Sequence, residues 1–84
     1  MYYVYIVECK DSTLYTGWTT DIKRRIKEHN AGNGAKYTRV RYPVVLKHHE
    51  IFETKQEAMK REWAIKRLSR QQKIALFTKQ YAND

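Results

Sequence analysis

The sequence that decides the fold is YYVYIVEC, residues 2–9, in which every residue except Glu8 is aromatic, β-branched or cysteine. An uninterrupted run of this kind, about eight residues long, is typical of a strand that is buried on both faces. We therefore predict that residues 2–9 form the central strand of the fold.

The residues that follow this run predict a hairpin. Residues 10–13, KDST, are a turn sequence, and residues 14–18, LYTGW, make a second short strand. The short gap favours an antiparallel connection, which places Tyr5 and Tyr15 on neighbouring strands. Gly17 lies near the end of the second strand, where the missing side chain leaves room for a ligand or another strand.

The next segment has the pattern of an amphipathic helix. Thr20 or Asp21 can cap its start, and it should end near Asn30, since two glycines follow closely. One face of this helix carries residues at spacings of three and four: Ile22, Arg25, Ile26 and His29. Arg25 thus lies at the edge of an apolar stripe, where its guanidinium must meet an anion or open water.

Three further elements are predicted after an exposed basic loop over residues 31–42. They are a strand over residues 44–52, a helix over about residues 55–68 that opens with the capping box Thr54-Lys55-Gln56-Glu57, and a last helix after Ser69. The predicted fold is α+β: a small three-stranded antiparallel sheet flanked by helices, in the order β-β-α-β-α-α. We expect a single domain over residues 1–84, because a chain of 84 residues builds one modest core.

The chain is strongly basic. It has 17 Lys and Arg residues against nine Asp and Glu, a formal net charge of +8, and its pI is near 9.7. Such an excess favours a polyanionic partner, and we expect phosphate contacts from the basic residues before and within the loop: Lys23, Arg24, Lys36, Arg39 and Arg41. A solvated cationic surface is the alternative, because charge alone does not identify a ligand.

The chain has a single cysteine, Cys9, and neither a secretory leader pattern nor an apolar run of 18 residues. We therefore expect a cytoplasmic protein with no membrane partner, in which Cys9 is a small core residue rather than a catalytic thiol. His48 and His49 do not predict a zinc site, because adjacent strand residues face opposite sides.

Glu62 is the candidate acid of the second predicted helix. It shares a helix side with Ala58 and Ile65, so its carboxylate is directed inward. A partly buried carboxylate needs a cation, a metal ion or several hydrogen-bond donors to stay ionised. Glu62 therefore either binds a metal ion or simply pairs with a base such as Arg25 or Lys66.

Taken together, these residues resemble a GIY-YIG nuclease domain, from Tyr3 to about Lys66. The first motif of that family, Gly-Ile-Tyr, stands here as Tyr3-Val4-Tyr5, and the second, Tyr-Ile-Gly, as Tyr15-Thr16-Gly17. The first motif lacks its glycine, which affects the local backbone geometry. The sequence is similar to small one-domain bacterial members and to the catalytic subunits of structure-selective endonucleases.

The resemblance implies roles for individual residues. Arg25, ten positions after Tyr15, corresponds to the catalytic arginine, and His29 to a histidine that hydrogen-bonds a tyrosine or the leaving group. Glu62 corresponds to the metal-binding glutamate, which implies Mg²⁺ or Mn²⁺ held by one protein carboxylate. Tyr5 is the implied general base, which requires either that Arg25 and the metal lower its pKa or that it acts through a transient phenolate, while Tyr15 orients the water or the phosphate.

The activity that the resemblance implies is metal-dependent hydrolysis of phosphodiester bonds, in DNA rather than RNA, at branched or distorted structures and with little sequence preference. The alternative is a nucleic-acid-binding module of the same fold that cuts slowly or not at all. On the strand and helix patterns alone, Tyr5 and Tyr15 can instead be sheet core, and His29 a plain C-terminal helix residue. A protein partner for targeting is compatible with either activity, and a monomer is the default.

Overall fold

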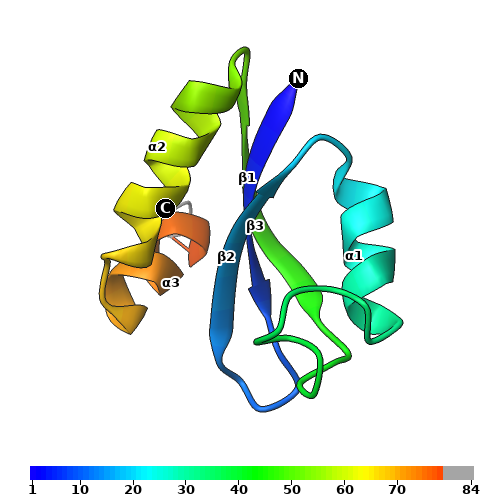
Figure 1. Cartoon of the computed structure of the whole chain (residues 1–84). Coiled ribbons are helices and arrows are strands. Elements are labelled where there is room, and N and C mark those ends of the chain that lie inside the picture. Colours follow the sequence, from blue (N-terminus) through cyan, green and yellow to red (C-terminus); the bar gives the residue numbers. More distant parts are fainter. Residues whose placement is uncertain (79–84) are drawn as a thin grey trace.

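The computed structural model describes residues 1–78 of the chain. Its elements are β1 (Tyr2–Glu8), β2 (Leu14–Thr19), α1 (Ile22–Asn30), β3 (Val45–Phe52), α2 (Lys55–Lys66) and α3 (Arg70–Thr78) (Figure 1). The predicted α+β class and the β-β-α-β-α-α order are confirmed. No helix within residues 1–78 is long and apolar enough to cross a membrane.

The strands form one antiparallel sheet in the order β2-β1-β3, with β1 in the centre as predicted. Val4 and Val7, which point to opposite faces, are both fully buried, so β1 is covered on both sides. The register pairs Tyr5 with Gly17 and Val7 with Tyr15. The hairpin therefore brings both motif tyrosines to the same face of the sheet.

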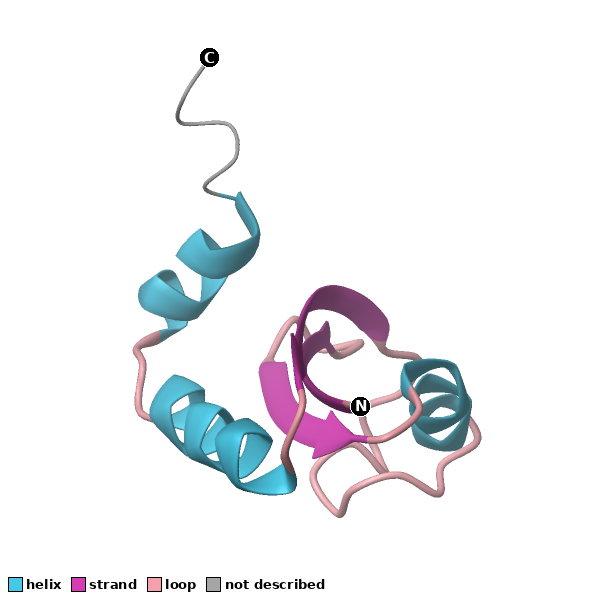
Figure 2. Ribbon diagram, turned by 90° about the horizontal axis from the view of Figure 1, so that it is seen from above, coloured by secondary structure: helices cyan, strands magenta, loops and turns pink. Residues whose placement is uncertain are grey.

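Helix α1 covers one face of the sheet, and α2 and α3 cover the other (Figures 1 and 2). The α2 side has a buried core of Val4, Ile6, Ala58 and Ile65. The α1 side has a second buried core of Tyr5, Val7, Cys9 and Val44. Side chains alternate along β1, so Tyr5 faces α1, whereas Glu62 belongs to the helix on the opposite face.

Both predicted caps form. The Asp21 side chain accepts a hydrogen bond from the Arg24 backbone N–H at 3.1 Å and starts α1. Thr54 and Glu57 make the reciprocal capping box of α2. Each cap contributes roughly 1 kcal/mol to helix stability by satisfying a free backbone donor. Helix α2 ends at Lys66, two residues before the predicted end, because the chain turns at the C-cap Arg67.

Helix α2 is held to β3 by a paired ionic contact. Arg61 donates from Nε and Nη2 to the two carboxylate oxygens of Glu50, at 2.8 and 3.0 Å. His48 Nε2 lies 2.8 Å from one of these oxygens, whereas His49 pairs with Tyr5 on β1 and borders a hollow on the α1 side. The two histidines therefore face different sides of the sheet.

The loop over residues 31–42 is not exposed throughout, and the prediction was wrong in its middle. Thr38 is fully buried. The loop is closed by Asn30, whose Oδ1 accepts from the Val44 backbone N–H at 2.6 Å and whose Nδ2 donates to the Val44 carbonyl at 3.3 Å. These bonds fold the loop back against α1, which the basic composition of the segment does not indicate.

Candidate functional site

Tyr5 reaches its position because the residue opposite it on β2 is a glycine. A Cβ atom on Gly17 would lie 2.7 Å from the Tyr5 hydroxyl oxygen, a distance that real Cβ atoms essentially never show. The ring therefore extends over β2, and only 1% of Tyr5 is exposed. The space requirement explains why the second motif ends in glycine.

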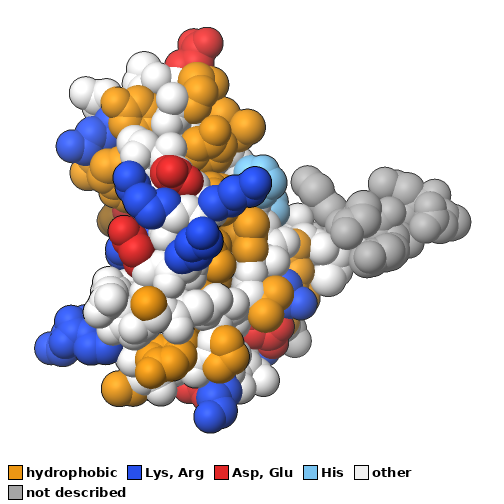
Figure 3. All heavy atoms as spheres, turned by 90° about the vertical axis from the view of Figure 1, so that its right-hand side faces the viewer, with side chains coloured by type: hydrophobic (Ala, Val, Ile, Leu, Met, Phe, Trp, Pro, Cys, Tyr) orange, Lys and Arg blue, Asp and Glu red, His pale blue; other side chains and the backbone are white. Residues whose placement is uncertain are grey.

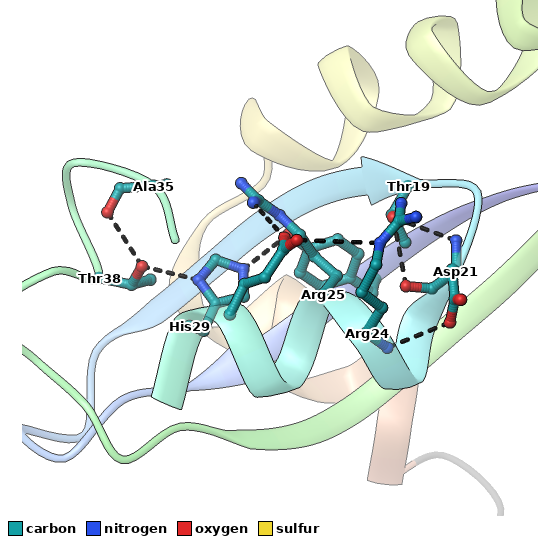
Figure 4. Close-up of polar contacts among 9 residues, drawn as sticks. Thr19, Asp21, Arg24, Arg25, His29, Ala35 and Thr38 are labelled. Carbon is teal, nitrogen blue, oxygen red and sulfur yellow. Dashed lines mark hydrogen bonds and ion pairs between the residues drawn. The ribbon is translucent and has the colours of Figure 1, made fainter. Parts of the chain in front are cut away.

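A hydrogen-bonded chain runs from Tyr5 through α1 into the loop (Figure 4). The links are Tyr5 hydroxyl to His29 Nε2 at 2.8 Å, His29 Nδ1 to Thr38 Oγ1 at 2.7 Å, and Thr38 Oγ1 to the Ala35 carbonyl at 3.0 Å. Tyr5, His29 and Thr38 are almost completely buried, so water does not compete for these bonds.

The chain of bonds assigns the tautomer of His29. The Thr38 hydroxyl has one hydrogen, which it donates to the Ala35 carbonyl, so its oxygen must accept from His29 Nδ1–H. The neutral ring then has a free lone pair on Nε2, which accepts the Tyr5 O–H. Burial lowers the pKa of His29, and the nearby Arg25 charge lowers it further, so the neutral form is favoured.

Gly34 supports the same histidine from the loop. A Cβ atom added to Gly34 would overlap His29 Nδ1 and lie within 2.9 Å of the His29 Cα. Only a glycine lets the loop approach α1 this closely. From the sequence, Gly34 indicates the end of the helix and Thr38 belongs to the basic loop, and neither is predicted to contact His29.

Burial raises the pKa of Tyr5 to about 12. The Arg25 guanidinium opposes this rise, whereas Tyr15 and Glu62 add to it. Desolvation of the phenolate therefore outweighs the Arg25 charge, and the expected lowering of this pKa by Arg25 and a metal ion together stays a prediction. At neutral pH Tyr5 is a phenol that donates to His29.

Arg25 projects from α1 at the β2 edge of the sheet. Its side chain is 27% exposed, and Nη1 donates to Glu28 Oε1 at 2.9 Å. A hollow of about 280 Å³ lies beside it, lined by Trp18, Thr19, Thr20, Arg24, Arg25 and Glu28. This hollow is large enough to admit a phosphate group next to the guanidinium.

Glu62 approaches the same edge from the other face of the sheet. Its side chain is 19% exposed, and Oε2 lies 3.3 Å from Lys66 Nζ. The carboxylate pairs with Lys66 rather than with Arg25, and it does not line the hollow beside Arg25. Its negative charge nevertheless reaches the Tyr5 phenol, whose pKa it helps to raise.

The donor groups near Glu62 fit a hydrated, hard divalent cation. Within residues 1–78, no group of three or more His, Cys, Asp or Glu side chains could hold a metal ion. Glu62 would be the only carboxylate ligand, an arrangement that Mg²⁺ tolerates because it keeps several waters. The buried Thr16 hydroxyl on the α2 side of β2 has no hydrogen-bond partner among the described residues.

Tyr15 is held by ring contacts rather than by a hydrogen-bonded chain. Its ring centroid lies 5.6 Å from that of His29 and 6.1 Å from that of Tyr37, on which it stacks. Arg41 covers Tyr37 at 4.0 Å from the ring centroid. The structure therefore shows that Tyr37 is a neighbour of Tyr15. The sequence does not predict this contact, because the two residues are far apart along the chain.

The basic residues expected to bind phosphate are in two different situations. Lys23, Arg24, Lys36 and Arg39 are exposed, and Lys and Arg side chains gather over the α1 side of the molecule (Figure 3). Arg41 is instead committed to Asp11 at 3.0 Å and to the Tyr37 carbonyl at 2.8 Å. It ties the loop to the hairpin turn, and its guanidinium is less available to a ligand.

A family model described as the GIY-YIG catalytic domain matches residues 1–75. The chain belongs to the GIY-YIG family. A UPF0213 protein of Halobacterium salinarum is 64% identical over 77 residues, which cover 92% of this chain and 100% of that protein. A UPF0213 protein of Staphylococcus haemolyticus is 60% identical over 75 residues, covering 89% of this chain and 92% of that one.

Two solved structures are similar to this chain in fold and sequence. The solution NMR structure of a UPF0213 protein from Bacillus halodurans has a TM-score of 0.57 and 55% identity, covering 90% of this chain and 82% of that one. The solution NMR structure of a protein from E. faecalis has a TM-score of 0.60 and 43% identity, covering 99% and 88%. Membership of the GIY-YIG family implies nuclease activity, a nucleic-acid substrate and a divalent metal.

The glycine that the first GIY-YIG motif lacks here is replaced by Tyr3, which borders a second hollow of about 520 Å³ between α1 and β3. His49 and Leu46 line it from the sheet and Ile22 from the helix. Tyr3 pairs with Thr19 and Ile51 in regular antiparallel register, so the substitution does not disturb the strand.

Proposed function

We propose that the protein is a divalent-metal-dependent endonuclease that hydrolyses phosphodiester bonds in DNA. The observation that carries this proposal is the buried chain Tyr5–His29–Thr38, which ends beside Arg25 and the phosphate-sized hollow. Selection of branched or distorted DNA is part of the proposal, because exposed basic side chains contact phosphates and so read shape rather than base sequence.

The proton path follows the tautomer of His29. As a water molecule attacks phosphorus, its proton passes to the Tyr5 oxygen while the Tyr5 proton passes to His29 Nε2. His29 then carries hydrogens on both ring nitrogens, and Nδ1–H keeps its bond to Thr38. Tyr5 thus remains neutral overall, which avoids a phenolate whose formation the raised pKa of about 12 opposes.

Arg25 is the proposed phosphate ligand. A scissile phosphate replaces Glu28 as the anion that the guanidinium binds, in a bidentate pair that stabilises the charge developing on phosphorus. Tyr5 is buried and lies next to Arg25. A shift of the Arg25 side chain from Glu28 to the phosphate therefore also uncovers the phenol for the attacking water. Tyr15, which contacts His29 through its ring, orients the water or the phosphate.

Glu62 is the proposed metal ligand, and the Thr16 hydroxyl the proposed partner of a metal-bound water. Mg²⁺ or Mn²⁺ bound there would neutralise the charge that develops on the leaving 3′-oxygen. Lys66 Nζ, 3.3 Å from Glu62 Oε2, is the cation that the metal ion would displace from the carboxylate.

The test is a cleavage assay with labelled branched, single-stranded and duplex DNA and matched RNA, in Mg²⁺, Mn²⁺ or EDTA. We expect Arg25→Ala to reduce cleavage by about 100-fold or more. Lys27→Ala is the matched control, since Lys27 is exposed on the same helix and does not line the hollow. Tyr5→Phe should also change the pH dependence of cleavage. Cutting that survives Arg25→Ala and Glu62→Ala would overturn the proposal.

A second function is a binding module that recognises nucleic acid without cutting it. One observation favours it: Glu62 lies outside the hollow that Arg25 lines. In that case DNA binds equally in EDTA and Mg²⁺, no product appears, and Glu62→Ala leaves the affinity unchanged. A protein partner that completes or targets the site would restore cutting when added to the assay.

A further inference from the structure

The two tryptophans of the chain have opposite surroundings. Trp18 on β2 packs against the core of the α2 side and against the Tyr2 ring. Trp63 on α2 is 60% exposed, although an indole ring gains much by burial. Met59, one turn earlier on the same helix, is 45% exposed. The structure of the domain itself does not account for a large aromatic ring at this position.

Trp63 lies on the outer face of α2, one residue after the proposed metal ligand Glu62. Two contacts define the sides of this helix: Lys55 Nζ lies 5.5 Å from the Trp18 ring on β2, whereas Arg61 bonds Glu50 on β3. With about 100° between successive helical residues, Glu62 follows on the β2 side and Trp63 lies a further 100° round, on the outer face of α2. The exposed ring therefore points away from the core, one residue beyond the proposed metal ligand along the helix.

The charges around Trp63 select the kind of ligand. The Arg67 guanidinium carbon lies 4.5 Å from the Trp63 ring centroid. Lys55 and Lys66 lie on the same side of α2, with Glu62 as the neighbouring acid. An indole beside cations matches a nucleic-acid strand, in which a flat base is followed by a phosphate. A second copy of this chain would bring the same positive charge against itself.

We propose that Trp63, with Arg67, forms a stacking platform for an unpaired nucleotide base next to the phosphate at the proposed active site. The base must be unpaired, because both faces of a base inside a duplex are covered by its neighbours. This proposal rests on the proposed nucleic-acid site, and it adds a reason for recognising distorted DNA: a displaced base occupies the platform.

The test measures binding in EDTA, so that cleavage plays no part. The probes are a fluorescently labelled thymidine oligonucleotide and a strand of equal length whose sugars carry no bases. We expect Trp63→Ala to weaken binding of the thymidine strand by about tenfold, to leave the base-free strand unaffected, and to be rescued largely by Trp63→Phe. Arg67→Gln should weaken thymidine binding more than Lys10→Gln, which removes an equal charge from an exposed position in the hairpin turn.

Tryptophan fluorescence tests directly whether a base contacts the Trp63 ring. In Trp18→Phe the emission comes from Trp63 alone, and we expect the thymidine strand to quench it and the base-free strand not to. If Trp18→Phe does not fold, the binding affinities for the two strands test the proposal without the fluorescence measurement. Equal loss of affinity for both strands, or no loss, would overturn the proposal. So would concentration-dependent dimerisation that Trp63→Ala abolishes. If the wild-type protein binds neither strand, the proposed function itself fails.

Discussion

The two faces of the sheet hold their candidate site residues in different ways. On the α1 face, Tyr5, His29 and Thr38 form a buried chain whose hydrogen bonds determine where each proton lies. On the α2 face, Glu62 pairs with an exposed lysine, and the Thr16 hydroxyl of β2 has no hydrogen-bond partner among residues 1–78.

This difference shows which residues of the proposed mechanism are already in position before a ligand binds. Proton transfer needs fixed donors and acceptors, and the α1 face supplies them before any ligand binds. A hydrated metal ion needs few protein ligands, so the α2 face contributes little beyond one carboxylate. Changes on the α2 face should therefore affect activity more than stability, and changes on the α1 face should affect both.

The largest expected effect comes from Glu62→Gln. The neutral amide keeps the shape of the side chain but loses the charge that holds a divalent cation, so metal-dependent cleavage should fall by about 100- to 1000-fold. The loss of an exposed ion pair with Lys66 should change the free energy of unfolding by less than about 1 kcal/mol. Steady-state cleavage and urea unfolding measure the two quantities. Glu53→Gln is the control, since Glu53 is exposed.

On the α1 face, Gly34→Ala should be the most destabilising change. The added methyl overlaps His29 Nδ1, and the loop must move away from α1. Overpacking of this kind costs about 1–3 kcal/mol. Urea unfolding should show this loss, whereas Asn33→Ala in the same loop, at an exposed position, should stay near wild type. Equal stability of the two variants would contradict the close approach of the loop.

Thr38→Val tests the tautomer assignment. Valine has nearly the shape of threonine but cannot accept from His29 Nδ1–H, and the unpaired donor should cost about 1–2 kcal/mol of stability. Cleavage should fall by about tenfold, because the hydrogen can then move to Nε2, which donates to the Tyr5 oxygen and no longer accepts the Tyr5 proton. ¹⁵N NMR of the imidazole should show Nδ1–H in the wild type and in Thr38→Ser. A wild-type ring with Nε2–H would contradict the assignment.

The buried histidine also makes stability depend on pH. Burial lowers the pKa of His29 from its ordinary value of 6.5. The unfolded chain therefore binds this proton first as the pH falls, so stability should be complete above about pH 6.5 and decline below it. Urea unfolding at pH 7.5 and 5.5 measures the decline. It should be weaker in His29→Gln and unchanged in His49→Gln, an exposed control.

The smallest expected effect is that of Thr16→Val on the α2 face. Replacing an unpartnered buried hydroxyl by a methyl should be neutral or stabilising by up to about 1 kcal/mol. If the hydroxyl bonds a metal-bound water, the Mg²⁺ concentration that gives half-maximal cleavage should rise. Marked destabilisation would show that the hydroxyl has a structural partner and would remove the contrast between the faces.

Much of the site can be predicted from the sequence because it rests on local patterns. The hairpin that pairs Tyr5 with Gly17 follows from a short turn between two apolar runs. The helix that carries Arg25 and His29 follows from its spacing and its cap. Thr38 was missed for the opposite reason: its partner lies nine residues away across a loop with no regular period.

By itself, the sequence determined the α+β class, the central strand, the basic character and the residues that resemble a nuclease site, since these depend on period, composition and order along the chain. The tertiary structure alone decided that the Tyr5 hydroxyl donates to His29, that burial raises the Tyr5 pKa, and that Glu62 and Arg25 approach from opposite faces. Desolvation and hydrogen-bond direction arise only when segments distant in the chain exclude water together, and a one-dimensional pattern does not contain that information.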